Sequence, residues 1–183
     1  MTGDDAVGAH ACRVEPLCEE DIPELVALAR DTWHRHYPAI ISVAQIEYML
    51  AERYDPDVIR AQLRSPDTWW DKLVLDGRMA AFASYERGRY AGDIKIDKLY
   101  ASYALRGRGL GSILLQHVEQ KARAMGATRL YLQVNKNNAS AIATYRKNGF
   151  EIAESAVFDI GGGFVMDDYV MEKILDARPR TGS

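Results

Sequence analysis

Two arginines and three glycines stand together where a helix is expected to begin. The stretch LRGRGLGSILLQHVEQ runs from Leu105 to Gln120, and its second half has the apolar spacing of a helix. Glycine in a helix costs roughly 1 kcal/mol of stability relative to alanine, so the bare backbone must serve another purpose. A helix N-terminus exposes unpaired N–H groups and the positive end of a dipole, which glycine lets an anion approach. The stretch therefore predicts a phosphate cradle, to which Arg106 and Arg108 add positive charge.

Two better-known phosphate loops do not match this stretch. A P-loop requires a lysine followed by serine or threonine, and no lysine is present here. The Rossmann fingerprint requires the spacing G-x-G-x-x-G, which Gly107, Gly109 and Gly111 do not have. Taken alone, the stretch leaves open a second reading, a glycine-rich turn with solvated arginines.

A second patterned stretch, NNASAIATYRKNGF, lies further along the chain and ends at Phe150. Together the two stretches resemble the GNAT (Gcn5-related) N-acetyltransferase family. The first, with Arg106-x-x-Gly109-x-Gly111, is similar to the family's pyrophosphate-binding motif. The second is similar to the signature N-x-x-A-x-x-x-Y-x-x-x-G-F. The residues in register with that signature are Asn138, Ala141, Tyr145, Gly149 and Phe150.

The resemblance runs from about Asp93 to Ile174 and is looser over the N-terminal half, where the family itself varies. Within the family, the stretches DIKIDKLYASYALRGRGLG and GFVMDDYVMEKIL look most like the bacterial polyamine (spermidine/spermine) acetyltransferase branch.

The resemblance implies acetyl-CoA as the cosubstrate. Backbone N–H groups between Gly107 and Ser112 are expected to hold its pyrophosphate, and an open strand edge near Tyr100 is expected to pair with the pantetheine arm. One of those N–H groups is also expected to polarise the thioester carbonyl. Asn138 is expected to hydrogen-bond the arm, and a plain helix N-cap is its alternative role. The expected cofactor-binding residues are Leu99, Tyr100, Ala101, Arg106, Gly107, Arg108, Gly109, Leu110, Gly111, Ser112, Asn138 and Tyr145.

Acetyl transfer to an amine poses two proton problems. An alkylamine resembles lysine, with a pKa of about 10.4, so it must lose a proton before it attacks. The leaving thiolate must gain a proton, and general acid catalysis at that step is worth about 10²–10⁴-fold. The motif tyrosine, Tyr145, is the expected acid. On spacing alone, its commoner role would be a core aromatic of an amphipathic helix.

A carboxylate is expected to accept the proton of the amine. Asp97 lies two residues before Leu99 on the same expected strand, so their side chains share a face. The resemblance implies that a carboxylate at this position acts directly or through water. A surface ion pair with a nearby lysine is the alternative role of Asp97.

Other polar residues are candidates for the neighbourhood of the acceptor. The further carboxylates are Asp93, Glu47, Asp167 and Asp168. Adjacent residues of a strand face opposite ways, so at most one of Asp167 and Asp168 points into a given cleft. The segment TWHRHY, residues 32–37, resembles the part of the family that forms one wall of the acceptor site. Its histidines, His34 and His36, are expected to be exposed or structural rather than catalytic.

The elements that must position these residues follow from periodicity and turn residues. Apolar spacing predicts helices over 19–37, 42–54, 56–65, 110–126 and 138–148. Alternation and turn signals predict strands at 13–17, on both sides of Asp76-Gly77, at 93–103 and 128–134, and on both sides of 161–163. We expect an α/β (α+β) fold, a GNAT-like single mixed, mostly antiparallel sheet of about seven strands with helices on both faces. One acetyltransferase domain is expected over residues 12–175, with flexible tails at 1–11 and 176–183.

The composition of the chain argues against several classes of binding partner. The net charge of −3 over 183 residues lacks the basic surface that nucleic acid requires. Cys12 and Cys18 form no CxxC pair or Cys/His zinc spacing, so no metal is expected and the thiols are expected to be reduced. No apolar run approaches the ~20 residues of a membrane span, and the first residues lack a signal-peptide pattern. We expect a cytoplasmic protein with no nucleic-acid or membrane partner. The family resemblance, rather than the composition, implies a homodimer through the last strands.

These observations predict an enzyme that moves an acetyl group from acetyl-CoA to a primary amine. The favoured acceptor is a polyamine or another small cationic amine, in keeping with the branch resemblance and the mildly acidic balance. A protein N-terminus, a lysine or an amino acid is the alternative acceptor. A non-catalytic acyl-CoA-binding module is the alternative class, against which an intact Tyr145 argues.

Overall fold

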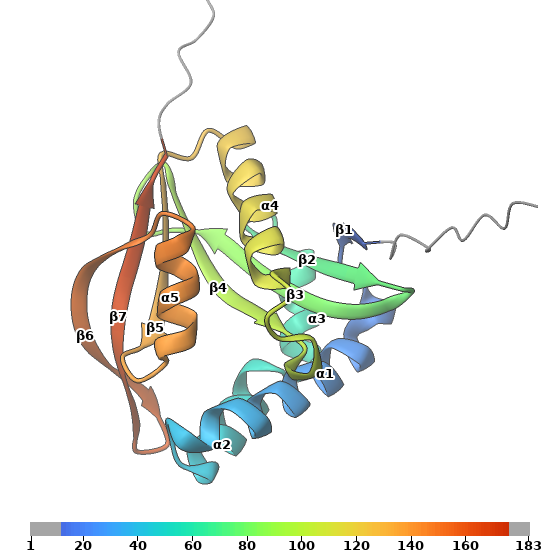
Figure 1. Cartoon of the computed structure of the whole chain (residues 1–183), viewed down its shortest axis with the longest axis vertical. Coiled ribbons are helices and arrows are strands. Elements are labelled where there is room, and N and C mark those ends of the chain that lie inside the picture. Colours follow the sequence, from blue (N-terminus) through green and yellow to red (C-terminus); the bar gives the residue numbers. More distant parts are fainter. Residues whose placement is uncertain (1–11, 176–183) are drawn as a thin grey trace, which may run out of the picture.

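The computed structural model of the chain describes residues 12–175, so the expected tails at 1–11 and 176–183 lie outside the described residues. One sheet of seven strands runs through the molecule in the order β1-β2-β3-β4-β5-β7-β6 (Figure 1). Neighbouring strands are antiparallel except for the parallel pair β4 and β5. The strands are β1 (Cys12–Pro16), β2 (Thr68–Leu75), β3 (Arg78–Arg87), β4 (Asp93–Ala101), β5 (Arg129–Asn135), β6 (Glu151–Gly161) and β7 (Phe164–Ile174).

The helices form where apolar spacing predicts them. They are α1 (Ile22–His36), α2 (Val43–Arg53), α3 (Pro56–Arg64), α4 (Leu110–Ala124) and α5 (Ala139–Lys147). The Ser42 side chain caps α2 by accepting a hydrogen bond from the Gln45 N–H at 3.2 Å, as its sequence predicts. The first helix is shorter than expected, because residues 19–21 and 37–39 form 3-10 turns at its two ends. No helix within residues 12–175 is long and apolar enough to cross a membrane.

Helices cover both faces of the sheet and enclose two apolar cores. Leu114 and Val118 of α4 and Ile142 of α5 pack with strand residues in the core on one face. Leu25 of α1 and Ile46 of α2 belong to the core on the other face, with residues of α3. The expected single mixed, mostly antiparallel sheet with helices on both faces is therefore confirmed.

A bulge in β4 opens the centre of the sheet. In the pairing of β3 with β4, Lys98 lies opposite Ser84 and Ile96 lies opposite Tyr85, so Asp97 has no partner residue. An extra residue of this kind bends a strand and increases its twist. Beyond Ile96, β4 no longer pairs with β5, and the two strands diverge (Figure 1). The edge of β4 that carries residues 97–101 is left unpaired on that side.

Candidate active site

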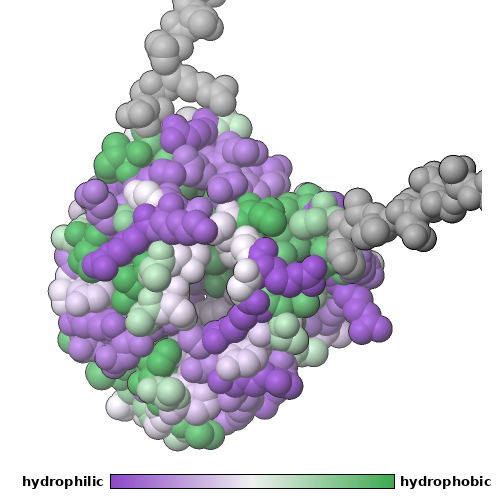
Figure 2. All heavy atoms as spheres, viewed as in Figure 1, coloured by the Kyte–Doolittle hydropathy of each residue, from purple (hydrophilic) through white to green (hydrophobic). Residues whose placement is uncertain are grey.

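A cavity of about 490 Å³ lies where β4 and β5 diverge. Its walls come from α1, α2, the four strands β4 to β7, the segment 105–107 with the first turn of α4, and one side of α5. The space-filling view shows a hollow near the middle of this face (Figure 2). Eleven of the twelve expected cofactor-binding residues line the cavity, and Arg108, which is exposed, does not.

The glycine–arginine stretch forms an open cradle at the start of α4. Gly107 and Gly109 have φ values of 78° and 76°, a left-handed conformation that favours glycine. A Cβ atom at either glycine would meet no other atom within 4 Å, so the backbone is bare on that side. No side chain caps the first turn of α4, which leaves its N–H groups free for an anion. The residues present thus fit a diphosphate.

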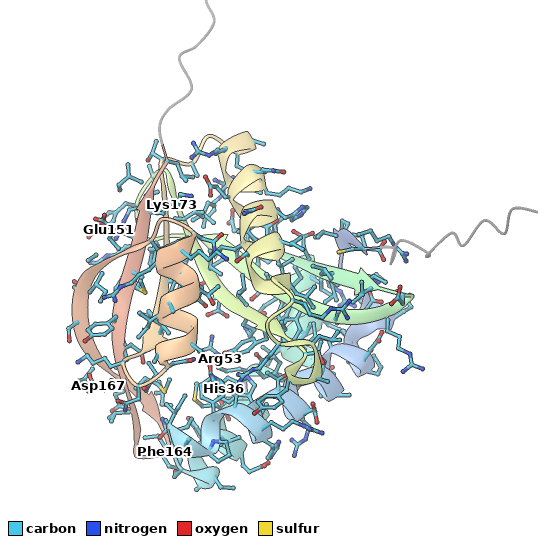
Figure 3. All side chains as sticks on the ribbon, in the orientation of Figure 1. His36, Arg53, Glu151, Phe164, Asp167 and Lys173 are labelled. Carbon is cyan, nitrogen blue, oxygen red and sulfur yellow. The ribbon has the colours of Figure 1, made fainter. Side chains whose placement is uncertain are left out.

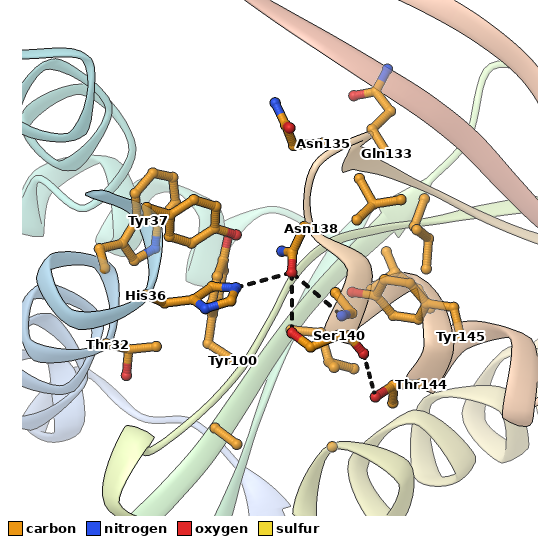
Figure 4. Close-up of a pocket in the computed structure, with 18 of the residues that line it drawn as sticks. Thr32, His36, Tyr37, Tyr100, Gln133, Asn135, Asn138, Ser140, Thr144 and Tyr145 are labelled. Atoms are coloured by element: carbon orange, nitrogen blue, oxygen red, sulfur yellow. Dashed lines mark hydrogen bonds between the residues drawn. The ribbon is translucent and has the colours of Figure 1, made fainter. Parts of the chain in front are cut away.

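His36 contacts both Arg106 and Asn138, and Figure 4 shows its contact with Asn138. The His36 Nδ1 atom lies 2.6 Å from the Arg106 guanidinium, and His36 Nε2 lies 3.0 Å from Asn138 Oδ1. Because a guanidinium only donates, the imidazole is neutral with its proton on Nε2. Burial, and then the neighbouring Arg106 charge, lower the pKa of His36, which agrees with this neutral form. His36 lines the cavity, and the expectation that it is exposed or structural rather than catalytic stays a prediction.

Asn138 also acts as the N-cap of α5. Its side-chain oxygen accepts a hydrogen bond from the Ala141 N–H at 3.4 Å and another from the Ser140 hydroxyl at 3.3 Å. The capping role named as its alternative is thus confirmed. A contact with the cofactor arm stays a prediction for this residue.

Tyr145 lines the cavity from α5, and its hydroxyl points toward the cavity (Figure 4). Only 8 % of the side chain is exposed. Burial raises the pKa of Tyr145, and the nearby Tyr37 raises it further. The phenol therefore keeps its proton at neutral pH, which a general acid requires.

Asp97 lines the cavity, but cations already surround it. Its carboxylate accepts hydrogen bonds from Arg53 at 2.6 Å and from Lys98 at 2.5 Å, and Lys95 lies 3.5 Å away. Although burial alone would raise the pKa of Asp97, the charges of Lys98 and Arg53 hold it well below its usual value. A carboxylate held in this way is a weak base. The catalytic role of Asp97 stays a prediction, and these ion pairs count against it.

The two neighbouring carboxylates of β7 face opposite ways, as strand alternation predicts. Asp168 lines the cavity and is 5 % exposed, whereas Asp167 lies outside it (Figure 3) and forms an ion pair with Lys136. Burial is the largest cause that raises the pKa of Asp168 to about 6, and the charge of Asp167 adds to it. Asp168 Oδ1 has no hydrogen-bond partner among the described residues.

The remaining candidates of the sequence lie elsewhere. Asp93 forms a buried ion pair with Arg129 at 3.0 Å, at the far end of β4. Glu47 is exposed on α2, where it pairs with His34 and Arg30. None of these side chains lines the cavity.

Several cavity residues escaped the sequence analysis. Arg53 ends α2 and has no motif around it that would distinguish it from an ordinary cation at a helix C-terminus. Within the segment 32–37, Trp33 stacks on Tyr37 at 4.4 Å and lies 5.7 Å from the ring of Tyr100 on β4. The contact of this segment with an acceptor stays a prediction. These three rings form one aromatic wall of the cavity.

Comparison with known proteins agrees with this geometry. The family model described as Acetyltransferase (GNAT) family matches residues 23–150. The chain belongs to the GNAT family. It is therefore an acyltransferase that transfers an acetyl group from acetyl-CoA to an amine, and both signature stretches lie within the matched residues.

Two similar proteins match this chain over nearly their whole length, and a third matches over about half of its length. Spermidine N(1)-acetyltransferase of Thermoplasma acidophilum is 25 % identical over 158 residues, which cover 84 % of this chain and 94 % of that protein. The crystal structure of PaiA N-acetyltransferase from Thermoplasma acidophilum, solved in complex with coenzyme A, superposes with a TM-score of 0.77 at 24 % identity, covering 90 % of this chain and 99 % of that one. The [ribosomal protein bS18]-alanine N-acetyltransferase of Salmonella typhimurium is 35 % identical over 82 residues, which cover 45 % of this chain and 54 % of that protein.

Proposed function

We propose that this acetyltransferase acts on a small cationic amine of the polyamine class. The observation that carries the proposal is the lining of the acceptor end of the cavity, where an aromatic wall meets a buried carboxylate. The wall consists of Trp33, Tyr37 and Tyr100, and the carboxylate belongs to Asp168. Aromatic faces attract alkylammonium groups, and a buried carboxylate supplies the opposite charge.

The acceptor end is also narrowed by contacts between α2 and the β6–β7 hairpin, which lie side by side in Figure 1. The Tyr48 hydroxyl donates to the Ile160 carbonyl at 2.9 Å, and the Gln45 side-chain amide donates to the Val165 carbonyl at 2.9 Å. A closed end of this kind suits a small amine better than a polypeptide. It therefore argues against a protein N-terminus or a protein lysine as the acceptor, although one partial relative acetylates a ribosomal protein.

The similarity to a spermidine acetyltransferase over nearly its whole length supports the same acceptor class. The non-catalytic alternative is less well supported, because Tyr145 is protonated and faces the cavity.

A cytoplasmic location is part of the proposal, as are reduced thiols at the exposed Cys12 and Cys18. A homodimer would use the edge strand β6, where Val157 is 64 % exposed.

The residues of the chain divide the chemistry between them. Acetyl-CoA supplies an activated thioester. N–H groups from Gly107 to Ser112 hold the diphosphate at the start of α4, and the unpaired edge of β4 at residues 99–101 aligns the pantetheine arm. An N–H group of that edge polarises the thioester carbonyl. Tyr145 donates its phenolic proton to the leaving sulfur.

Release of free CoA from acetyl-CoA tests the proposal against a panel of spermidine, spermine, simple diamines, amino acids, aminoglycosides and short peptides. We expect turnover with the polyamines and diamines and little with amino acids or peptides. Turnover restricted to peptides or amino acids would contradict the proposed acceptor and keep the transfer chemistry. Binding of acetyl-CoA without turnover on any amine would favour the binding-module alternative.

A Gly109→Asp variant serves as the control for cofactor binding. It places a side chain at a φ of 76° and a negative charge in the cradle, so acetyl-CoA binding is expected to be lost. Isothermal titration calorimetry checks this, and retained binding would show that the cradle lies elsewhere.

A further inference from the structure

Asp168 is a buried carboxylate without a compensating cation in contact. It is 5 % exposed, its Oδ1 has no hydrogen-bond partner, and no described residue forms an ion pair with it. Burial of a charged group without a partner is costly, so natural chains seldom keep one without a use for it. This side chain lines the cavity in which acetyl transfer takes place.

The sheet directs Asp168 at the acceptor end of that cavity. Met166 and Asp168 alternate with outward-facing residues on β7, and Phe158 and Ile160 line the same end from β6. The aromatic wall lies near Asp168: burial is the main cause that raises the pKa of Tyr37, and the charge of Asp168 adds to it. Asp168 thus lies among apolar and aromatic groups. Among the described residues that line the cavity, the other carboxylate is Asp97, which is ion-paired.

We propose that Asp168 is the catalytic base of this enzyme, and that its carboxylate takes a proton from the ammonium of the acceptor inside the cavity. The inference rests on the proposed acetyl transfer to a cationic amine and names the group that activates that amine.

The electrostatic surroundings suit this role. Burial and the charge of Asp167 raise the pKa of Asp168 to about 6, while the charges of Arg53 and Lys136 act in the opposite direction. A base with a pKa near the working pH is mostly ionised at pH 7 and still holds a proton well. The apolar surroundings also lower the pKa of a bound ammonium, because burial disfavours every charged form. The difference between the pKa of the bound ammonium and the pKa of Asp168 is therefore smaller inside the cavity than in water.

The proton and electron pairs balance over one turnover. The ammonium RNH₃⁺ gives one proton to Asp168, and the nitrogen lone pair then forms the N–C bond with the thioester carbonyl. As the C–S bond breaks, Tyr145 gives its proton to the sulfur and recovers one from the new amide nitrogen. Asp168 finally releases its proton to solvent. The sum is RNH₃⁺ plus acetyl-CoA going to the N-acetyl amine, CoA thiol and one H⁺.

The test compares Asp168→Asn with Asp167→Asn in the full chain, using acetyl-CoA and spermidine. The pH dependence of kcat/KM is measured from pH 5 to pH 10. For the wild type, we expect kcat/KM to fall below a pKa near 6. For Asp167→Asn, we expect the same limb at a somewhat lower pH, because the charge of Asp167 helps to raise the pKa of Asp168. For Asp168→Asn, we expect a loss of about 10²-fold in kcat at pH 7.5 and no acid limb near pH 6; kcat/KM should instead rise with the fraction of free amine up to the pKa of the amine, about 10.4. This loss should shrink about tenfold per pH unit toward pH 10, because free amine then arrives already deprotonated.

The outcomes separate this inference from the proposed function. An Asp168→Asn enzyme with unchanged kcat, or with the wild-type acid limb, would overturn the role of Asp168 while acetyl transfer stands. A raised KM with unchanged kcat at every pH would also overturn it, because the carboxylate would then only bind the ammonium. An equal loss of kcat in Asp167→Asn would overturn it as well, because the loss would then come from the net surface charge and not from Asp168. Wild-type protein that binds acetyl-CoA and turns over no amine would instead end the proposed function.

Discussion

Two carboxylates line the same cavity from opposite walls, and their surroundings differ. Asp97, on the β4 wall, contacts Arg53 and Lys98, and Lys95 lies nearby. Asp168, on the β7 wall, forms no ion pair with a described residue. The pKa of Asp97 is accordingly held well below its usual value, whereas the pKa of Asp168 is raised to about 6.

The difference separates a carboxylate that stabilises the fold from one that is available for chemistry. A neutralised carboxylate compensates buried cations and gives up its basicity. An unneutralised one lowers stability and keeps its affinity for a proton. Burial alone does not distinguish the two, since both side chains are largely buried. What distinguishes them is the number of cations within contact distance.

The largest effect is expected from a residue on neither carboxylate wall. Tyr145→Phe removes only the hydroxyl, so kcat should fall about 10²–10⁴-fold while acetyl-CoA affinity and the acid limb of Asp168 persist. Steady-state kinetics with calorimetric titration of acetyl-CoA measure both. A kcat within threefold of the wild type would leave Tyr145 a packing residue.

Substitution on the β4 wall should destabilise the protein. Asp97→Asn leaves Lys98, which is 3 % exposed, without its counter-charge. Breaking a buried pair in this way costs about 3–5 kcal/mol of the free energy of unfolding. Urea unfolding at pH 7.5 measures the loss. A change below about 1 kcal/mol would mean that Arg53 and Lys98 find other partners, and the contrast between the walls would weaken.

The corresponding substitution on the β7 wall, Asp168→Asn, should increase the free energy of unfolding rather than lower it. The raised pKa of Asp168 means that the folded protein binds this proton more tightly than the unfolded chain does. The associated stability is fully present below the unfolded pKa of about 3.9 and is lost as pH rises through about 6. Asp168→Asn removes this penalty, so it should stabilise the protein by up to about 3 kcal/mol at pH 7.5 and change little at pH 4.

Urea unfolding at both pH values measures this difference, with Asp167→Asn as the matched control. Asp167 is exposed, and its substitution should shift stability by no more than about 0.5 kcal/mol. Equal destabilisation by Asp168→Asn at the two pH values would show that the carboxylate is paired in solution.

The smallest expected effect is the electrostatic influence of Asp97 on the pKa of Asp168. The charge of Arg53 lowers the pKa of Asp168, and Asp97 offsets part of that charge. Asp97→Asn should therefore shift the acid limb of kcat/KM to lower pH, by less than about one unit. The pH profile of this variant beside that of the wild type provides the measurement. An unshifted limb would mean that the two walls act independently.

The part of the cavity that is expected to bind acetyl-CoA could be predicted from the sequence, because each of its elements lies within one short stretch of the chain. Gly107, Gly109 and the first turn of α4 are neighbours in the chain, and so are Asn138 and Tyr145. Their arrangement follows from local backbone geometry, including left-handed glycines and a helix N-cap. Most of the helices and strands followed for the same reason, with differences of a few residues where 3-10 turns extend a helix.

The acceptor end of the cavity depends on segments that are far apart in the chain. By itself, the sequence determined that Asp167 and Asp168 face opposite ways, because side chains alternate along any strand. Only the tertiary structure decided which of them enters the cavity, and which cations surround Asp97. Arg53 reaches that carboxylate from a helix 44 positions earlier in the chain. Coulomb energy depends on distance in space and on burial, and neither is encoded in local sequence, so the fold alone set the charge state of each wall.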